Sequence, residues 1–152
     1  MPTHPIRQLV DMYGPRRTVE ELGAKLGFHR NERQELAIVV SELCSNIVKY
    51  GVRGSIEIEP VDDPAHGPGI AIVARDVGPA FRDLGMALQD GCDDQGPIDP
   101  AKMLKRGGLG IGLGAVVRLM DTLDVVQHKS GKEIRAVRYR RRPRGMAGGI
   151  AF

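Results

Sequence analysis

Hydrophobic residues in the first third of the chain recur at helical spacing and predict two helices. The longer helix carries an apolar stripe formed by Leu36, Val40, Leu43 and Ile47. We expect Asn31 to cap its N-terminus and the helix to end near Gly51. A shorter helix should start at Gly14-Pro15 and stop at Gly27, because proline suits the first turn of a helix and glycine the position after the last.

The remaining apolar runs are short and bounded by turn residues, which is typical of strands. The predicted strands are residues 6–10, 55–60, 69–74, 122–128 and 133–139, with further helices at 81–89 and 111–120. A turn at Ser130-Gly131 should join the last two strands as a hairpin, and hairpins pair antiparallel strands. This order predicts an α/β (α+β) domain: a two-layer sandwich of a mixed, mostly antiparallel sheet with helices on one face.

The length of 152 residues suits one domain, which we place at residues 1–140, followed by a basic, flexible tail at 141–152. Hydrophobic residues make up 41% of the chain, enough for a core. No apolar run is long enough to span a bilayer, and Met1 to Val10 lacks the apolar segment of a signal peptide. We therefore expect a cytoplasmic protein that does not bind membranes.

The net charge of +3 depends on five arginines between Arg138 and Arg144, without which it would be −2. The basic character is therefore predicted to belong to the tail rather than to the domain. A nucleic-acid interface would favour basic residues interleaved with aromatic ones, and this chain has no Trp and only three Tyr and three Phe. The composition thus favours a solvated tail over nucleic-acid binding.

The first candidate for chemistry is the pair Glu42 and Asn46 on the longer predicted helix. Their i, i+4 spacing places both side chains on one face, at the flank of the apolar stripe. An Asn amide oxygen is a hard ligand that suits magnesium, and a carboxylate one turn away can accept a proton from an attacking hydroxyl. The same pair is also compatible with an ordinary polar flank of a helix.

The second candidate is Asp76, with Gly78 two residues later, directly after an apolar strand. A carboxylate at this position can accept a hydrogen bond from an exocyclic amine, and glycine lets a ligand approach the backbone. An ordinary Asp-Gly turn after a strand has the same pattern.

The third candidate is the glycine-rich segment 107–114, which precedes a predicted helix. Glycines let backbone amides surround phosphates, and a helix N-terminus adds positive potential. The segment contains a loose G-x-G-x-x-A pattern, but it does not follow a strand, as a dinucleotide-binding loop must. No Gly-Lys-Ser/Thr follows, so it is not a Walker A loop either.

Taken in order, these three motifs resemble those of the GHKL superfamily, which includes gyrase, histidine kinases and mismatch-repair ATPases. The resemblance extends from about Ile6 to Tyr139. The strings Ser-Glu-Leu-x-x-Asn-Ile and Gly-Gly-Leu-Gly-x-Gly-Leu look most similar to the stressosome switch kinase and the related anti-sigma-factor kinases. The resemblance implies the Bergerat-type ATP-binding fold, with ATP and magnesium as cofactors.

The resemblance also implies a role for each matching residue. Glu42 would be the catalytic base, Asn46 the magnesium ligand, and Asp76 the partner of the adenine amine, with Gly78 beside it. Residues 90–107 would form a lid over ATP. The remaining residues implied to contact the nucleotide are Lys105, Arg106, Gly108, Leu109, Gly110, Ile111, Gly112 and Leu113. Two positions differ from the family pattern: Ala80 replaces a glycine, and Lys132 replaces a threonine.

The family implies a serine/threonine protein kinase that transfers the γ-phosphate of ATP to a STAS-domain partner, the fold of anti-sigma-factor antagonists. Such a kinase acts by exchanging partners, which include a sigma factor or a phosphatase. A second hypothesis is a non-catalytic module that binds nucleotide and sequesters a sigma factor or activates a phosphatase. The presence of Glu42 favours the kinase, because nucleotide binding alone needs no base.

Overall fold

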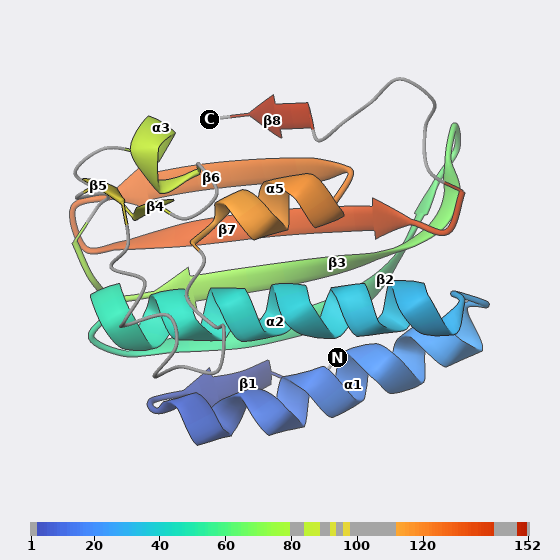
Figure 1. Cartoon of the computed structure of the whole chain (residues 1–152), viewed down its shortest axis with the longest axis horizontal. Coiled ribbons are helices and arrows are strands. Elements are labelled where there is room, and N and C mark those ends of the chain that lie inside the picture. Colours follow the sequence, from blue (N-terminus) through green and yellow to red (C-terminus); the bar gives the residue numbers. More distant parts are fainter. Residues whose placement is uncertain are drawn as a thin grey trace.

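The computed structural model describes residues 3–79, 84–88, 92–93, 96–97, 112–141 and 149–151. Figure 1 shows the helices and strands that these residues form. The N-terminal elements are β1 (Thr3–Ile6), the 3-10 helix η1 (Leu9–Met12), α1 (Tyr13–Lys25), α2 (Arg30–Tyr50), β2 (Gly54–Asp63) and β3 (Gly67–Asp76). The later elements are α3 (Leu84–Ala87), β4 (Cys92–Asp93), β5 (Gly96–Pro97), α5 (Gly114–Leu119), β6 (Thr122–His128), β7 (Gly131–Tyr139) and β8 (Gly149–Ala151).

Six of the strands form one sheet in the order β1-β2-β3-β7-β6-β8. Every neighbouring pair is antiparallel except β6 and β8, which run parallel. The helices α1, α2 and α5 lie together on one face of this sheet (Figure 1). The predicted two-layer fold with a mixed, mostly antiparallel sheet is therefore confirmed.

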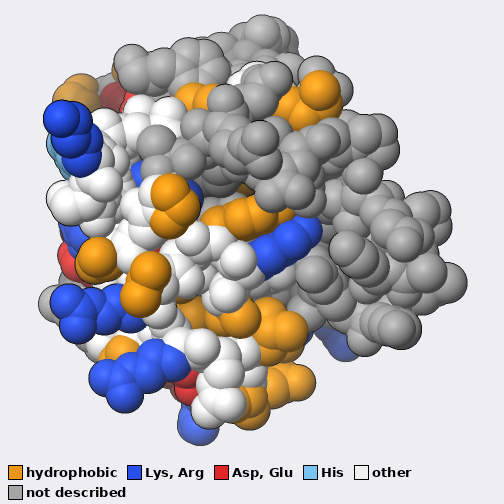
Figure 2. Space-filling view, turned by 90° about the vertical axis from the view of Figure 1, so that its left-hand side faces the viewer, with side chains coloured by type: hydrophobic (Ala, Val, Ile, Leu, Met, Phe, Trp, Pro, Cys, Tyr) orange, Lys and Arg blue, Asp and Glu red, His pale blue; other side chains and the backbone are white. Residues whose placement is uncertain are grey.

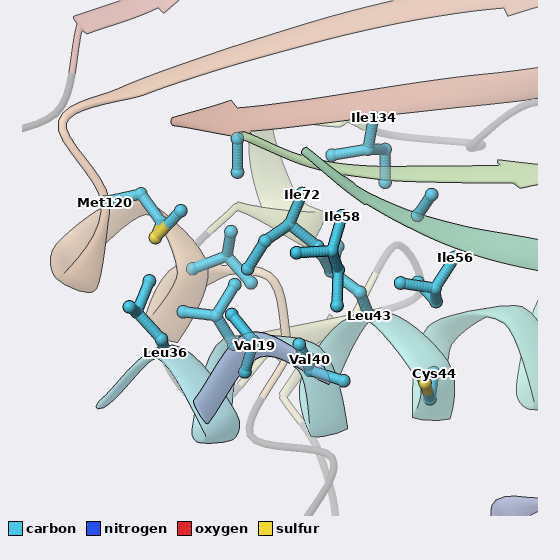
Figure 3. Packing of buried hydrophobic residues seen from close by; sticks show 14 of the residues in the cluster. Val19, Leu36, Val40, Leu43, Cys44, Ile56, Ile58, Ile72, Met120 and Ile134 are labelled. Carbon is cyan, nitrogen blue, oxygen red and sulfur yellow. The ribbon is translucent and has the colours of Figure 1, made fainter. Parts of the chain in front are cut away.

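The core lies between α2 and the sheet. Leu36, Val40 and Leu43 of the predicted stripe point from α2 toward the strands, where Ile58 and Ile72 lie (Figure 3). All five of these side chains are 0% exposed. Burying one such side chain stabilises the fold by about 1.5–3 kcal/mol, so this stripe fixes how α2 lies on the sheet. None of the helices in the described part of the chain is long and apolar enough to cross a bilayer.

Two predicted boundaries near the N-terminus are wrong. The first strand ends at Ile6 instead of continuing to Val10. The Asp11 carboxylate accepts hydrogen bonds from the N–H groups of Arg7 (2.9 Å) and Gln8 (3.1 Å), and these bonds hold the first turn of η1, which replaces the strand. The longer helix begins at Arg30, one residue before the expected cap Asn31. The N–H of His29 donates to Glu32 Oε1 at 2.9 Å there, so His29 holds the cap position.

The other predicted elements occur with shifted boundaries. The hairpin of β6 and β7 is present, while β2 and β3 each extend to ten residues because they pair along their whole length. Of the helix predicted at 81–89, the described residues show α3, and the helix predicted at 111–120 starts at Gly114. The segment expected to form a lid, 90–107, contains the short β4–β5 pair, and its other residues lie outside the described part of the chain.

The C-terminal arginines do not all belong to a tail. Arg138 lies in β7 and is only 4% exposed, so its charge is part of the folded domain. Residues 149–151, within the predicted tail, form β8 beside β6. The division at residue 140 and the flexibility of 141–152 stay predictions.

Candidate functional site

The predicted catalytic pair lies in the buried middle of α2. Glu42 is 3% exposed and Asn46 is 9% exposed. The sequence pattern places both on the flank of the helix, but every residue from Val39 to Ile47 is buried, because α2 contacts α1 and α5 as well as the sheet. Both side chains therefore lie where water is largely excluded. Electrostatic interactions with a ligand are stronger in such a place than in water.

Asp76 lies next to the C-terminal end of the same helix. It is the last residue of β3 and is 8% exposed. A Cβ atom built on Gly51, the residue after α2, would lie 2.9 Å from Asp76 Cβ. Gly51 follows Asn46 by five residues and Glu42 by nine, or about 7.5 Å and about 13.5 Å along a helix axis. A ligand that reaches from Asp76 to Glu42 must therefore be elongated, as a nucleoside triphosphate is.

The Asp76 carboxylate is bonded to a lysine of the neighbouring strand. Lys132 Nζ donates to Asp76 Oδ1 at 3.0 Å and to the carbonyl oxygen of Pro79 at 3.2 Å. The side chain of Lys132 is 1% exposed, and that of Asp76 is 3% exposed. Burial raises the pKa of Asp76 above its ordinary value, and the hydrogen bond and charge of Lys132 oppose that rise.

Glycines allow the backbones around Asp76 to come this close. A Cβ on Gly78 would lie 2.9 Å from both Gly51 Cα and the Tyr50 carbonyl oxygen, and a Cβ on Gly131 would lie 2.3 Å from the Asp76 carbonyl oxygen. The sequence pattern predicted ligand approach at Gly78, and it predicted only a helix end at Gly51 and a hairpin turn at Gly131. In the structure, the absence of a side chain at Gly78 is required by packing against the end of α2.

Of the predicted phosphate-binding residues, the structure describes Gly112 and Leu113, which lead into α5. Leu113 is 2% exposed and belongs to the core, and Gly112 has φ of 95°, a conformation that favours glycine. The contacts between α5 and α2 bring these two residues to the helix that carries Glu42. The other predicted contacts, Lys105, Arg106, Gly108, Leu109, Gly110 and Ile111, lie outside the described residues, as does Ala80.

The donor set fits a magnesium ion that is held mainly by phosphate. Among the described residues no group of three or more His, Cys, Asp or Glu side chains could hold a metal on its own. Asn46 offers one amide oxygen, and Mg²⁺ in phosphate-transferring sites is commonly bound by one or two protein oxygens together with substrate phosphates and water.

The surface beside Asp76 and the C-terminal end of α2 carries both cationic and apolar side chains. Figure 2 shows Lys and Arg side chains beside hydrophobic ones on its described part. A cavity of about 310 Å³ includes Arg7, Arg53 and Arg75 in its lining and borders the ends of β1, β2 and β3. Val52 and Val77 are 80% and 46% exposed, so this end also presents apolar area.

The chain matches a known protein family over most of its length. Residues 8–138 match the family described as the histidine kinase-like ATPase domain. The chain belongs to this family. Its helix with Glu42 and Asn46, its strand ending in Asp76 and the start of α5 are therefore parts of a histidine kinase-like ATPase domain, and the resemblance to GHKL ATPases is confirmed.

Two known proteins are similar to this chain over most of its length. The chain is 33% identical over 133 residues to the serine/threonine-protein kinase RsbT of Bacillus subtilis (strain 168), covering 86% of this chain and 90% of RsbT. The crystal structure of the SiaB–SiaC complex from Pseudomonas aeruginosa contains a chain with the same fold. That chain has a TM-score of 0.57 and 14% identity, with coverage of 90% of this chain and 89% of the other.

Proposed function

We propose that this protein is an ATP-dependent serine/threonine protein kinase that phosphorylates a STAS-domain partner and regulates signalling by exchanging partners. The observation that carries the proposal is the buried carboxylate of Glu42, one turn before Asn46, in a chain 33% identical to a serine/threonine-protein kinase. Partners would include a sigma factor or a phosphatase. We place the protein in the cytoplasm, where ATP is available.

In this proposal Glu42 accepts the proton of the attacking serine or threonine hydroxyl at a carboxylate oxygen. Its burial excludes water, which would otherwise compete with the hydroxyl. Asn46 would contribute its amide oxygen to a magnesium ion, which when bound would supply positive charge to balance that of the transferred phosphate. Phosphoryl transfer depends mainly on such positioning and electrostatics, so the fixed place of both residues on one helix matters.

The nucleotide would extend along the end of α2, with its base near Asp76 and its phosphates toward Glu42. The residues proposed to hold the phosphates are Lys105, Arg106, Gly108, Leu109, Gly110, Ile111, Gly112 and Leu113. Gly78 would lie beside the base, and residues 90–107 would close over the nucleotide. Figure 1 supports this arrangement, because α2, β3 and the start of β7 meet at the left end of the molecule as drawn.

The test compares Glu42→Gln with wild type in single-turnover transfer from magnesium-ATP to STAS-domain proteins, with ATP binding measured separately. Glu42→Gln keeps the size of the side chain, so binding should stay near wild type while transfer falls by about 10²–10⁴-fold. Glu59→Gln is the matched control, because Glu59 lies on β2 in a loose 3.7 Å pair with Arg135. It should transfer phosphate at the wild-type rate.

Asn46→Ala should differ from Glu42→Gln by losing magnesium-dependent ATP affinity as well as transfer. Wild-type transfer rates in Glu42→Gln would show that Glu42 is not the base. The alternative function is a non-catalytic nucleotide-binding module that sequesters a sigma factor or activates a phosphatase. Wild-type protein that binds ATP and a STAS partner but transfers no phosphate would establish that alternative.

A further inference from the structure

A buried lysine occupies the carboxylate that the proposed function assigns to base recognition. Lys132 and Asp76 are directly opposite each other in the β3–β7 ladder, so their side chains project from the same face of the sheet. The resulting contact joins Lys132 Nζ to Asp76 Oδ1 at 3.0 Å. Since the two strands are paired along eight positions, the contact is built into the register of the sheet.

A second bond holds the ammonium group in this place. Lys132 Nζ also donates to the Pro79 carbonyl oxygen at 3.2 Å, in the segment that leaves β3. The lysine side chain is 1% exposed, so its charge relies on these protein oxygens rather than on water. Removing one member of such a buried pair leaves an uncompensated charge and is strongly destabilising.

The exocyclic amine of adenine needs the same group on Asp76. The amine is a neutral donor, whereas the ammonium group is charged, so only the bond from the ammonium carries charge on both donor and acceptor, and it is the stronger of the two. A neutral amine therefore cannot displace Lys132 from Oδ1 without a net loss. At the second oxygen, Oδ2, it meets a carboxylate whose charge the ammonium group already neutralises, so its bond there is weakened. Binding of a purine would then gain little from its 6-amino group.

We propose that Lys132 determines base selectivity by pairing with the carboxylate that would otherwise distinguish a 6-aminopurine. This inference rests on the proposed nucleotide site and concerns only how that site treats the base. Its consequence is that affinity comes from the phosphates and sugar, and that purine nucleotides with and without a 6-amino group bind alike. Replacing Lys132 by a neutral residue of smaller size frees Asp76 and restores the distinction.

The experiment measures binding of two magnesium nucleotides by calorimetry: ADP and purine riboside 5′-diphosphate, which differs from ADP only in lacking the 6-amino group. Wild type should bind the two within about threefold of each other. Lys132→Thr should prefer ADP by about 10- to 100-fold, the value of a hydrogen bond to a charged group. Lys129→Thr, in the exposed turn between β6 and β7, is the control and should behave as wild type.

A wild-type preference for ADP of about tenfold or more would overturn the inference and leave the nucleotide site intact. A folded Lys132→Thr protein that still binds both nucleotides alike would also overturn it. Absence of binding to either nucleotide by wild type and variant would overturn the proposed function together with the inference. Circular dichroism checks folding, and if Lys132→Thr does not fold, the wild-type ratio decides alone.

Discussion

Arg138 connects three elements, and its replacement tests whether that connection stabilises the domain. Its guanidinium pairs with Glu35 and, at 3.5 Å, with Glu32 in the first turns of α2. Nη1 also donates to the carbonyl oxygen of Leu119, the last residue of α5, at 3.1 Å. The change Arg138→Met removes these bonds but keeps most of the buried aliphatic volume, so it isolates the polar contribution.

The expected loss in the free energy of unfolding depends on how well Glu32, Glu35 and the Leu119 carbonyl are solvated once the arginine is gone. A hydrogen bond to a charged group contributes about 1.5–3 kcal/mol. The side chains of Glu32 and Glu35 are 18% and 37% exposed, so both regain part of their hydration from water. The two carboxylates then repel each other on one helix face. Together these effects predict a loss of about 2–4 kcal/mol, or a Tm lower by about 6–12 °C for a chain of this length.

Arg135→Met is the matched control, because Arg135 lies three residues earlier on the same strand. Its side chain is 38% exposed, and its Nη2 lies 3.7 Å from Glu59. An exposed pair contributes about 0–1 kcal/mol, so this variant should stay close to wild type. Urea unfolding followed by circular dichroism measures both changes. A free energy of unfolding that falls equally in the two variants would refute the reasoning, because burial would then make no difference.

Two further predictions concern the surroundings of the site. Gly131→Ala should lower the free energy of unfolding by about 2 kcal/mol or more, because the new Cβ would lie 2.3 Å from the Asp76 carbonyl oxygen; urea unfolding close to that of wild type would contradict this. Burial, with a smaller effect of Asp11, raises the pKa of the Cys44 thiol to about 12, which leaves about 10⁻⁴ of it as thiolate at pH 8. Iodoacetamide followed by peptide mass mapping should therefore find Cys44 unmodified in folded protein and modified in guanidinium, and fast modification of the folded protein would contradict the burial.

The features that the sequence determines by itself are those that depend on neighbouring residues. The apolar stripe of α2 follows from helical spacing, and the same spacing places Glu42 and Asn46 on one side of one helix. The hairpin of β6 and β7 follows from two apolar runs around a short turn. Because these signals are local, the order of the elements and the class of fold can be predicted without knowing which strands pair.

Only the tertiary structure decides what distant residues do to one another. Lys132 and Asp76 are 56 residues apart, and Arg138 and Glu35 are 103 residues apart. Period-two alternation predicts that a strand residue faces the core, but the register of two strands decides which side chain it meets there. The burial of Glu42 likewise depends on α1 and α5 lying on either side of α2. Glu42, Asn46 and Asp76 could therefore be predicted as candidate site residues from the sequence. The ion pair of Asp76 with Lys132, in contrast, arises from the register of β3 with β7.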